Sequence, residues 1–139
     1  MNAKRIKVAV TRQLPEPVET RLKELFDVKL SCSHMPMSTK QILDIVKDFD
    51  VLVPTIGDRI DSHVIQNSGK RLSLIANYGA GFDHIDVSFA NSKNITVTNT
   101  PNVLTEDTAD MAMALILSVP RRIKEGVKKL QDDDWDGWA

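Results

Sequence analysis

The sequence is short of several features, and each absence excludes a class of protein. It has one cysteine, Cys32, so it cannot form an internal disulfide and fits a reducing compartment. Its longest apolar run, Met111–Leu117, is too short to span a bilayer, and the N-terminus lacks the apolar core of a signal peptide. The net charge is only −1, which argues against a nucleic-acid partner. We therefore expect a cytoplasmic protein without membrane or nucleic-acid contacts.

Metal-binding signatures are also missing. The three histidines share no ligand spacing, and the acidic run Asp132–Asp134 is most simply a solvated loop. No metal site is predicted.

The composition that remains is that of an ordinary globular domain, with 139 residues of which 42% are hydrophobic. Short β-branched or apolar runs alternate with segments of helical periodicity, which favours an α/β fold with a parallel sheet between helical layers. We predict a flavodoxin-like, doubly wound sheet with the strand order 2-1-3-4-5. The five expected strands are residues 6–10, 28–30, 50–54, 72–76 and 95–98.

The stretch Leu72–Asp86 organises the chain, and we interpret it as a strand, a glycine turn and a helix that starts near Asp83. Ligands of open parallel sheets bind beyond the carboxyl ends of the strands. A turn containing Gly79 and Gly81 at that edge lets backbone N–H groups converge on an anion. Our hypothesis is that this turn holds the carboxylate of a small substrate.

The turn has two other interpretations. The dinucleotide fingerprint G-x-G-x-x-G is rejected, because His84 replaces its third glycine and no acidic residue follows a second strand at the required distance. The other is a tight turn that only reverses the chain, and the local pattern alone favours it.

The pattern changes after residue 100. Thr105 is a candidate N-cap, and residues 109–119 are apolar on nearly all sides, which predicts a helix that is buried all round. Pro120 should kink or restart this helix. The polar tail carries Trp135 and Trp138, whose large rings should be covered by a partner subunit or a missing part of the protein.

Three strings now indicate a family: residues 77–86 (NYGAGFDHID), 99–110 (NTPNVLTEDTAD) and 135–138 (WDGW). In this order and at these separations, they resemble the D-isomer-specific 2-hydroxyacid dehydrogenases, and most of all the glyoxylate/hydroxypyruvate reductase branch. The resemblance implies that residues 1–100 are a flavodoxin-like substrate-binding domain. Residues 101–139 would be a hinge, a long interdomain helix and a loop that leads into an absent Rossmann domain binding NAD or NADP.

The same resemblance implies roles for individual residues. The backbone N–H groups of Ala80 and Gly81 would hold the substrate carboxylate, and Ala80 would also lie near the cofactor. The remaining site residues would be Thr55 and Ile56 beside the substrate, Thr108 near the nicotinamide, and Trp138 in the active site of the partner subunit. The family implies a homodimer formed through the 105–130 helix and the loop of Trp135 and Trp138.

The implied reaction is the NAD(P)H-dependent reduction of a small 2-oxoacid, glyoxylate or hydroxypyruvate, to the D-2-hydroxyacid. The family's G-x-G-x-x-G and its catalytic Arg, Glu and His match nothing in these 139 residues, so we expect the chain alone to be inactive. The alternative is a non-catalytic binding or regulatory module on the same flavodoxin-like fold.

Overall fold

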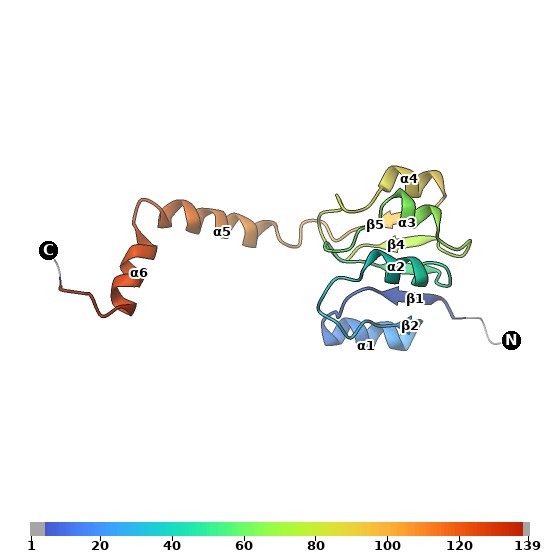
Figure 1. Cartoon of the computed structure of the whole chain (residues 1–139), viewed down its shortest axis with the longest axis horizontal. Helices are drawn as coiled ribbons and strands as arrows, with labels where there is room; N and C mark the ends of the chain where they lie inside the picture. Colours follow the sequence, from blue (N-terminus) through green and yellow to red (C-terminus); the bar gives the residue numbers. More distant parts are fainter. Residues whose placement is uncertain (1–4, 138–139) are drawn as a thin grey trace. The chain divides into compact units, whose positions relative to one another are not determined.

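The computed structural model describes residues 5–137 (Figure 1). The chain divides into two units, residues 1–101 and residues 102–139. The first unit holds the sheet and the second holds two helices.

The first unit is built on one five-stranded sheet in which every strand pairs in parallel with its neighbours. The strand order is β2-β1-β3-β4-β5, and Figure 1 shows the strands side by side. The predicted flavodoxin-like α/β fold and its strand order are thus confirmed. The strands are β1 (Lys7–Val10), β2 (Asp27–Lys29), β3 (Val51–Val53), β4 (Leu74–Ala76) and β5 (Thr96–Thr98).

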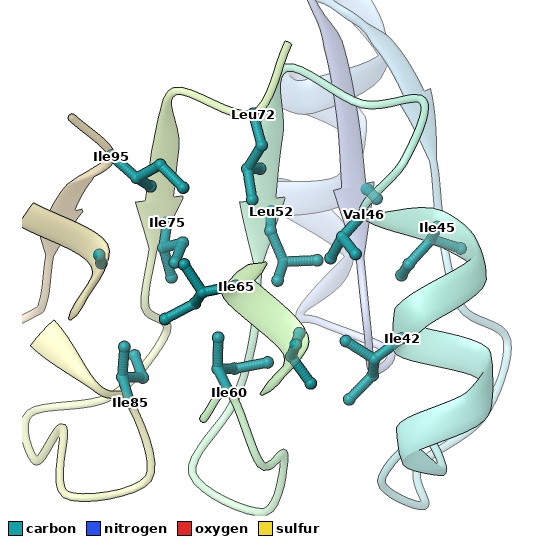
Figure 2. Close-up of a cluster of buried hydrophobic side chains, with 13 residues drawn as sticks. Ile42, Ile45, Val46, Leu52, Ile60, Ile65, Leu72, Ile75, Ile85 and Ile95 are labelled. Atoms are coloured by element: carbon teal, nitrogen blue, oxygen red, sulfur yellow. The ribbon is translucent and has the colours of Figure 1, made fainter. Parts of the chain in front are cut away.

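The larger of two hydrophobic clusters joins one face of the sheet to α2 (Thr39–Ile45), α3 (Ser62–Gln66) and α4 (Val87–Ser92). Leu52 and Ile75, at the middle of their strands, are completely buried. Figure 2 shows Ile42 of α2 and Ile65 of α3 among these strand residues. Because side chains alternate along a strand, the flanking residues of β1 and β3 point to the opposite face.

That opposite face carries the smaller cluster, in which Val8, Val10 and Val53 pack with Leu22 of α1 (Glu16–Leu25) and with Phe26 directly after it. Strands buried on both faces are typical of parallel sheets, and the apolar β1 and β3 sequences follow from it. The sheet therefore has helices on both faces, as the doubly wound fold requires.

Local sequence signals place most helix starts. Ser38 and Gln41 form a capping box at α2: Ser38 Oγ accepts from the Gln41 N–H at 3.4 Å, and Gln41 Oε1 accepts from the Ser38 N–H at 2.9 Å. Asp61 caps α3 by accepting from the Val64 N–H at 3.1 Å. Pro15 directly precedes α1.

One predicted helix start in the first unit is wrong. The helix after the glycine turn begins at Val87 and not at Asp83, because the Asp86 carboxylate caps it by accepting from the Phe89 N–H at 2.9 Å. The preceding residues cannot join the helix, because Ile85 is buried and forms an isolated parallel bridge with Ile60. Burial of this pair outweighs the local tendency to extend the helix.

The second unit contains α5 (Thr105–Ser118) and α6 (Ile123–Gln131). The helical segment expected over residues 105–130 is interrupted at Pro120, as predicted, and Arg122 between α5 and α6 has a φ of 53°. Pro120 explains the break, because it cannot donate the hydrogen bond that would continue α5. The prediction that Thr105 is the N-cap is wrong by one position: Thr105 is the first helical residue, and Leu104 occupies the N-cap position without a side-chain cap.

The apolar side chains of α5 are exposed in this chain, although the sequence predicts burial. Those of Met111, Leu115, Ile116 and Leu117 are each about 60% exposed. Within residues 5–137, no helix has the length and apolar character needed to cross a membrane.

Candidate anion-binding site at the carboxyl edge of the sheet

The glycine turn follows β4, and its carbonyl groups are held by two asparagine side chains. The Asn77 amide Nδ2 donates to the carbonyl oxygens of Gly79 at 3.1 Å and Gly81 at 2.8 Å. Asn99, which follows β5, donates from its Nδ2 to the carbonyl oxygen of Ala80 at 2.8 Å. Three successive carbonyls of the turn are thus engaged inside the protein.

The backbone N–H groups of the same turn, in contrast, have no hydrogen-bond acceptor among the described residues. Across the described residues 5–137, no acceptor is found for the N–H groups of residues 79–82. Gly81 and Phe82 are exposed, and Ala80 is half-buried. Backbone N–H groups that converge at a turn and lack internal acceptors form a concavity suited to an anion. The structure thus presents donors where the sequence predicts a carboxylate.

The two glycines of the turn differ in the space around them. A Cβ on Gly79 would lie 2.8 Å from Ile56 Cγ2, so the loop after β3 packs directly against the turn. A Cβ on Gly81 would have Asp83 Oδ2 as its nearest neighbour, at 3.8 Å. Gly81 also has no positive φ. A methyl group at position 79 would therefore have to displace Ile56, whereas position 81 has free space on the exposed side of the turn.

The loop after β3 is held by a buried carboxylate. Asp58 is fully buried, and its Oδ2 accepts from Thr11 Oγ1 at 2.5 Å, from the Thr55 N–H at 2.8 Å and from Thr55 Oγ1 at 3.2 Å. The other oxygen, Oδ1, accepts from the Met37 N–H at 3.3 Å. The Thr55 side chain is consequently turned into the protein, whereas Ile56 is 67% exposed beside the turn.

We expect Asp58→Ala to lower the free energy of unfolding by about 3 kcal/mol, because the N–H and hydroxyl of Thr55 lose their acceptor and the buried Thr11 hydroxyl keeps only the Val53 carbonyl at 3.3 Å. Urea unfolding of the 139-residue chain measures this change. The control is Asp44→Ala, which removes an exposed carboxylate of α2 that makes only a long contact of 4.0 Å to Lys47. Equal unfolding free energies for the two variants would contradict the structural role of Asp58.

His84 lies behind the turn and contacts Asn77. Its Nε2 is 3.0 Å from Asn77 Oδ1. Because the Asn77 amide nitrogen already donates to two carbonyls, Oδ1 is the acceptor and His84 Nε2 carries the proton. Burial lowers the pKa of His84, while the charges of Asp58 and Asp83 act in the opposite direction. The position of His84 fits packing behind the turn rather than catalysis.

The lowered pKa of His84 predicts a pH-dependent stability. When the pH falls below about 7, the unfolded chain binds a proton at this histidine before the folded chain does, so the stability decreases. We expect the thermal midpoint of the wild type to fall more steeply between about pH 7 and pH 5 than that of His84→Asn. His63→Asn, which removes an exposed histidine, is the control. Parallel curves for wild type and His84→Asn would refute this prediction.

The remaining predicted site residues lie in the second unit or outside the described part. Thr108 is exposed on the first turn of α5, and Trp138 lies outside the described residues. The structure brings Thr55, Ile56, Ala80 and Gly81 to one edge of the sheet, as predicted.

Sequence reasoning missed three residues of this edge, Asn77, Asn99 and Asp58. Their signal is a polar residue that follows an apolar strand or lies in the loop after it. That signal does not reveal that the asparagine amides face the carbonyls of the turn, or that the carboxylate is buried.

The fold and this edge define an α/β protein whose fourth strand is followed by a turn with inward-bonded carbonyls and backbone N–H groups that have no acceptor within residues 5–137. The sequence model of the family described as "D-isomer specific 2-hydroxyacid dehydrogenase, catalytic domain" matches residues 8–132. The chain belongs to this family.

Named relatives agree with this assignment. A glyoxylate reductase of Pyrococcus furiosus is 41% identical over 129 residues, which cover 93% of this chain and 38% of the relative. A glyoxylate reductase of Korarchaeum cryptofilum is also 41% identical over 129 residues, covering 93% of this chain and 39% of the relative. The chain thus spans about two fifths of the length of these relatives.

Solved structures show the same fold. A crystal structure of a Thermus thermophilus protein has a TM-score of 0.85 and 38% identity, and the match covers 96% of this chain and 43% of that one. A glyoxylate/hydroxypyruvate reductase of Sinorhizobium meliloti, solved in complex with NADP and malonate, has a TM-score of 0.76 and 27% identity. That match covers 94% of this chain and 39% of the reductase.

Proposed function

We propose that this chain is the substrate-binding part of an NAD(P)H-dependent 2-hydroxyacid dehydrogenase that reduces glyoxylate or hydroxypyruvate to the D-2-hydroxyacid. The observation that supports it best is the turn at residues 79–82, whose carbonyls are engaged internally and whose N–H groups are left as donors. Two relatives named as glyoxylate reductases and a solved relative in complex with malonate, a dicarboxylate, support the choice of a small carboxylate substrate.

In this proposal the N–H groups of Ala80 and Gly81 bind the substrate carboxylate through charge-assisted hydrogen bonds. Holding the carboxylate fixes where the adjacent keto carbon lies, and orientation of this kind can supply much of the rate enhancement of an enzyme. Ile56, exposed beside Gly79, would form the apolar wall of the substrate site, with the buried Thr55 holding its loop.

The cofactor would be bound mainly by a further domain of the complete enzyme. The 139 residues contain no G-x-G-x-x-G loop for a dinucleotide pyrophosphate, and Ala80 and Thr108 alone cannot hold one. The chain's own residues therefore do not fit the whole cofactor, and the choice between NAD and NADP would rest with that domain. Catalytic Arg, Glu and His residues would also come from it.

We propose further that the cytoplasmic enzyme is a homodimer formed through α5, α6 and the loop carrying Trp135 and Trp138. The exposed apolar side chains of α5 support this interface, because several large apolar side chains exposed on one helix are typical of a surface that a partner covers.

The test compares the complete enzyme with the 139-residue chain. We expect the enzyme to oxidise NADH or NADPH when glyoxylate is added, with oxalate competing against glyoxylate. The chain alone should show no activity, yet oxalate should shift its Ala80 and Gly81 amide resonances in ¹H–¹⁵N spectra. Two results together would overturn the proposal: the complete protein is inactive with glyoxylate and hydroxypyruvate, and oxalate does not shift the turn resonances of the chain. The alternative, a non-catalytic binding or regulatory module, would then be favoured.

A further inference from the structure

Asn77 engages both the nitrogen and the oxygen of its side-chain amide in hydrogen bonds around the turn that follows it. The residue is only 3% exposed. Its two amide hydrogens serve the carbonyls of Gly79 and Gly81, and its Oδ1 accepts from His84 Nε2 at 3.0 Å. An asparagine satisfied on both sides in this way has a single amide orientation, so its donors are aimed permanently at the turn.

Because the peptide bond is planar, the hydrogen bonds to these carbonyls also fix the direction of the N–H groups. In a planar trans peptide, the C=O of one residue and the N–H of the next point in opposite directions. Carbonyls of Gly79, Ala80 and Gly81 that are bonded inside the protein therefore direct the N–H groups of Ala80, Gly81 and Phe82 away from Asn77 and Asn99. Three successive donors are aligned by two side chains.

The end of β5 contributes to the same arrangement. Asn99 Nδ2 bonds the Ala80 carbonyl, and the Thr100 N–H donates to the Gly79 carbonyl at 3.0 Å. These residues directly precede Pro101, the last residue of the first unit. The turn after β4 is thus bonded to the segment that leads out of the sheet unit as well as to its own strand.

We propose that Asn77 and Asn99 are positioning residues for carboxylate binding: they hold the turn's carbonyls inward so that the amides of Ala80, Gly81 and Phe82 face the ligand. The proposal rests on the proposed function, because it assumes that the turn binds a carboxylate. Neither asparagine needs to touch the ligand, and the third donor, Phe82, extends the site beyond the two residues indicated by the family resemblance.

The test measures oxalate binding to the 139-residue chain through the ¹H–¹⁵N resonances of the turn. We expect Asn99→Ala to remain folded with a thermal midpoint near that of the wild type, since Asn99 is only half-buried. Its dissociation constant for oxalate should be about tenfold higher, because the Ala80 carbonyl and the Gly81 N–H are released. Asn77→Ala should weaken binding further. Oxalate should shift the Phe82 amide in the wild type and much less in both variants.

The control is Asn67→Ala, which removes an asparagine whose Nδ2 also donates to a carbonyl, that of His63 at 2.8 Å, but at the end of α3. It should bind oxalate as the wild type does. If the wild-type chain itself fails to bind oxalate, this inference fails, and the activity of the complete enzyme with glyoxylate then decides whether the proposed function fails as well. If the wild type binds and Asn99→Ala binds equally well, only the positioning role is overturned. Should Asn77→Ala not fold, Asn99→Ala alone decides.

Discussion

Gly81→Val should lower the kcat/KM of the complete enzyme for glyoxylate by about 100-fold, the size of effect seen when one preorganised donor is removed from an active site. The reason is that Gly81 lies on the exposed side of the turn, where an isopropyl group would cover the N–H groups proposed to bind the carboxylate. The fold should tolerate the change, because the nearest atom to an added Cβ is 3.8 Å away and no positive φ is needed.

The measurement is steady-state oxidation of NAD(P)H at varied glyoxylate, together with a thermal unfolding curve of each variant. Gly81→Ala provides an intermediate step: its methyl group should reduce kcat/KM by less than the valine does. Unchanged kcat/KM in Gly81→Val, at an unchanged thermal midpoint, would show that the turn does not bind the substrate. A large fall in the midpoint would instead contradict the structural claim that position 81 has free space.

Gly69→Ala should lower the free energy of unfolding by about 3 kcal/mol, a value in the upper range for overpacking. A Cβ at this position would lie 2.0 Å from the Lys47 carbonyl oxygen and 2.8 Å from the Lys47 carbonyl carbon. Both are backbone atoms that cannot rotate away. The Gly69 N–H also donates to the Val46 carbonyl at 3.0 Å, so relief of the clash would cost that bond.

Urea unfolding of the 139-residue chain tests this prediction, and Gly81→Ala is the matched control. Both variants add the same methyl group to a glycine of the first unit. The control should change the unfolding free energy by less than about 0.5 kcal/mol, as for an ordinary surface substitution. Similar values for the two variants would mean that the segment before β4 can move away from Lys47 at little cost.

Gly69 and Gly81 illustrate a property that the sequence does not predict, namely the space around a glycine. Both stand in short polar segments beside β4, and no local pattern distinguishes a glycine in contact with the Lys47 backbone from one with open space around it. The contact at Gly69 depends on a chain segment 22 residues earlier, which only the packed structure brings into place. A sequence pattern reports the conformation a residue favours locally but not what lies next to it.

The helix starts illustrate the same division. Ser38 and Asp61 were predictable because a cap is an interaction between residues three apart. The start of α4 was predicted four residues too early, since the segment before Asp86 is held by the bridge of Ile85 to Ile60, a long-range contact. Pro120 was expected to interrupt the helical segment after residue 105, and it does so by separating α5 from α6.

The sequence by itself determined the alternation of strands and helices, the glycine turn after the fourth strand and the family, because periodicity, caps and motifs are properties of neighbouring residues. Only the tertiary structure decided how that turn is oriented. The amides of Asn77 and Asn99 reach its carbonyls from the ends of two strands, and Asp58 bonds to Thr11 across 47 positions of the chain. Hydrogen-bond partners of buried polar groups are selected by packing, so the direction of the N–H groups follows from the fold.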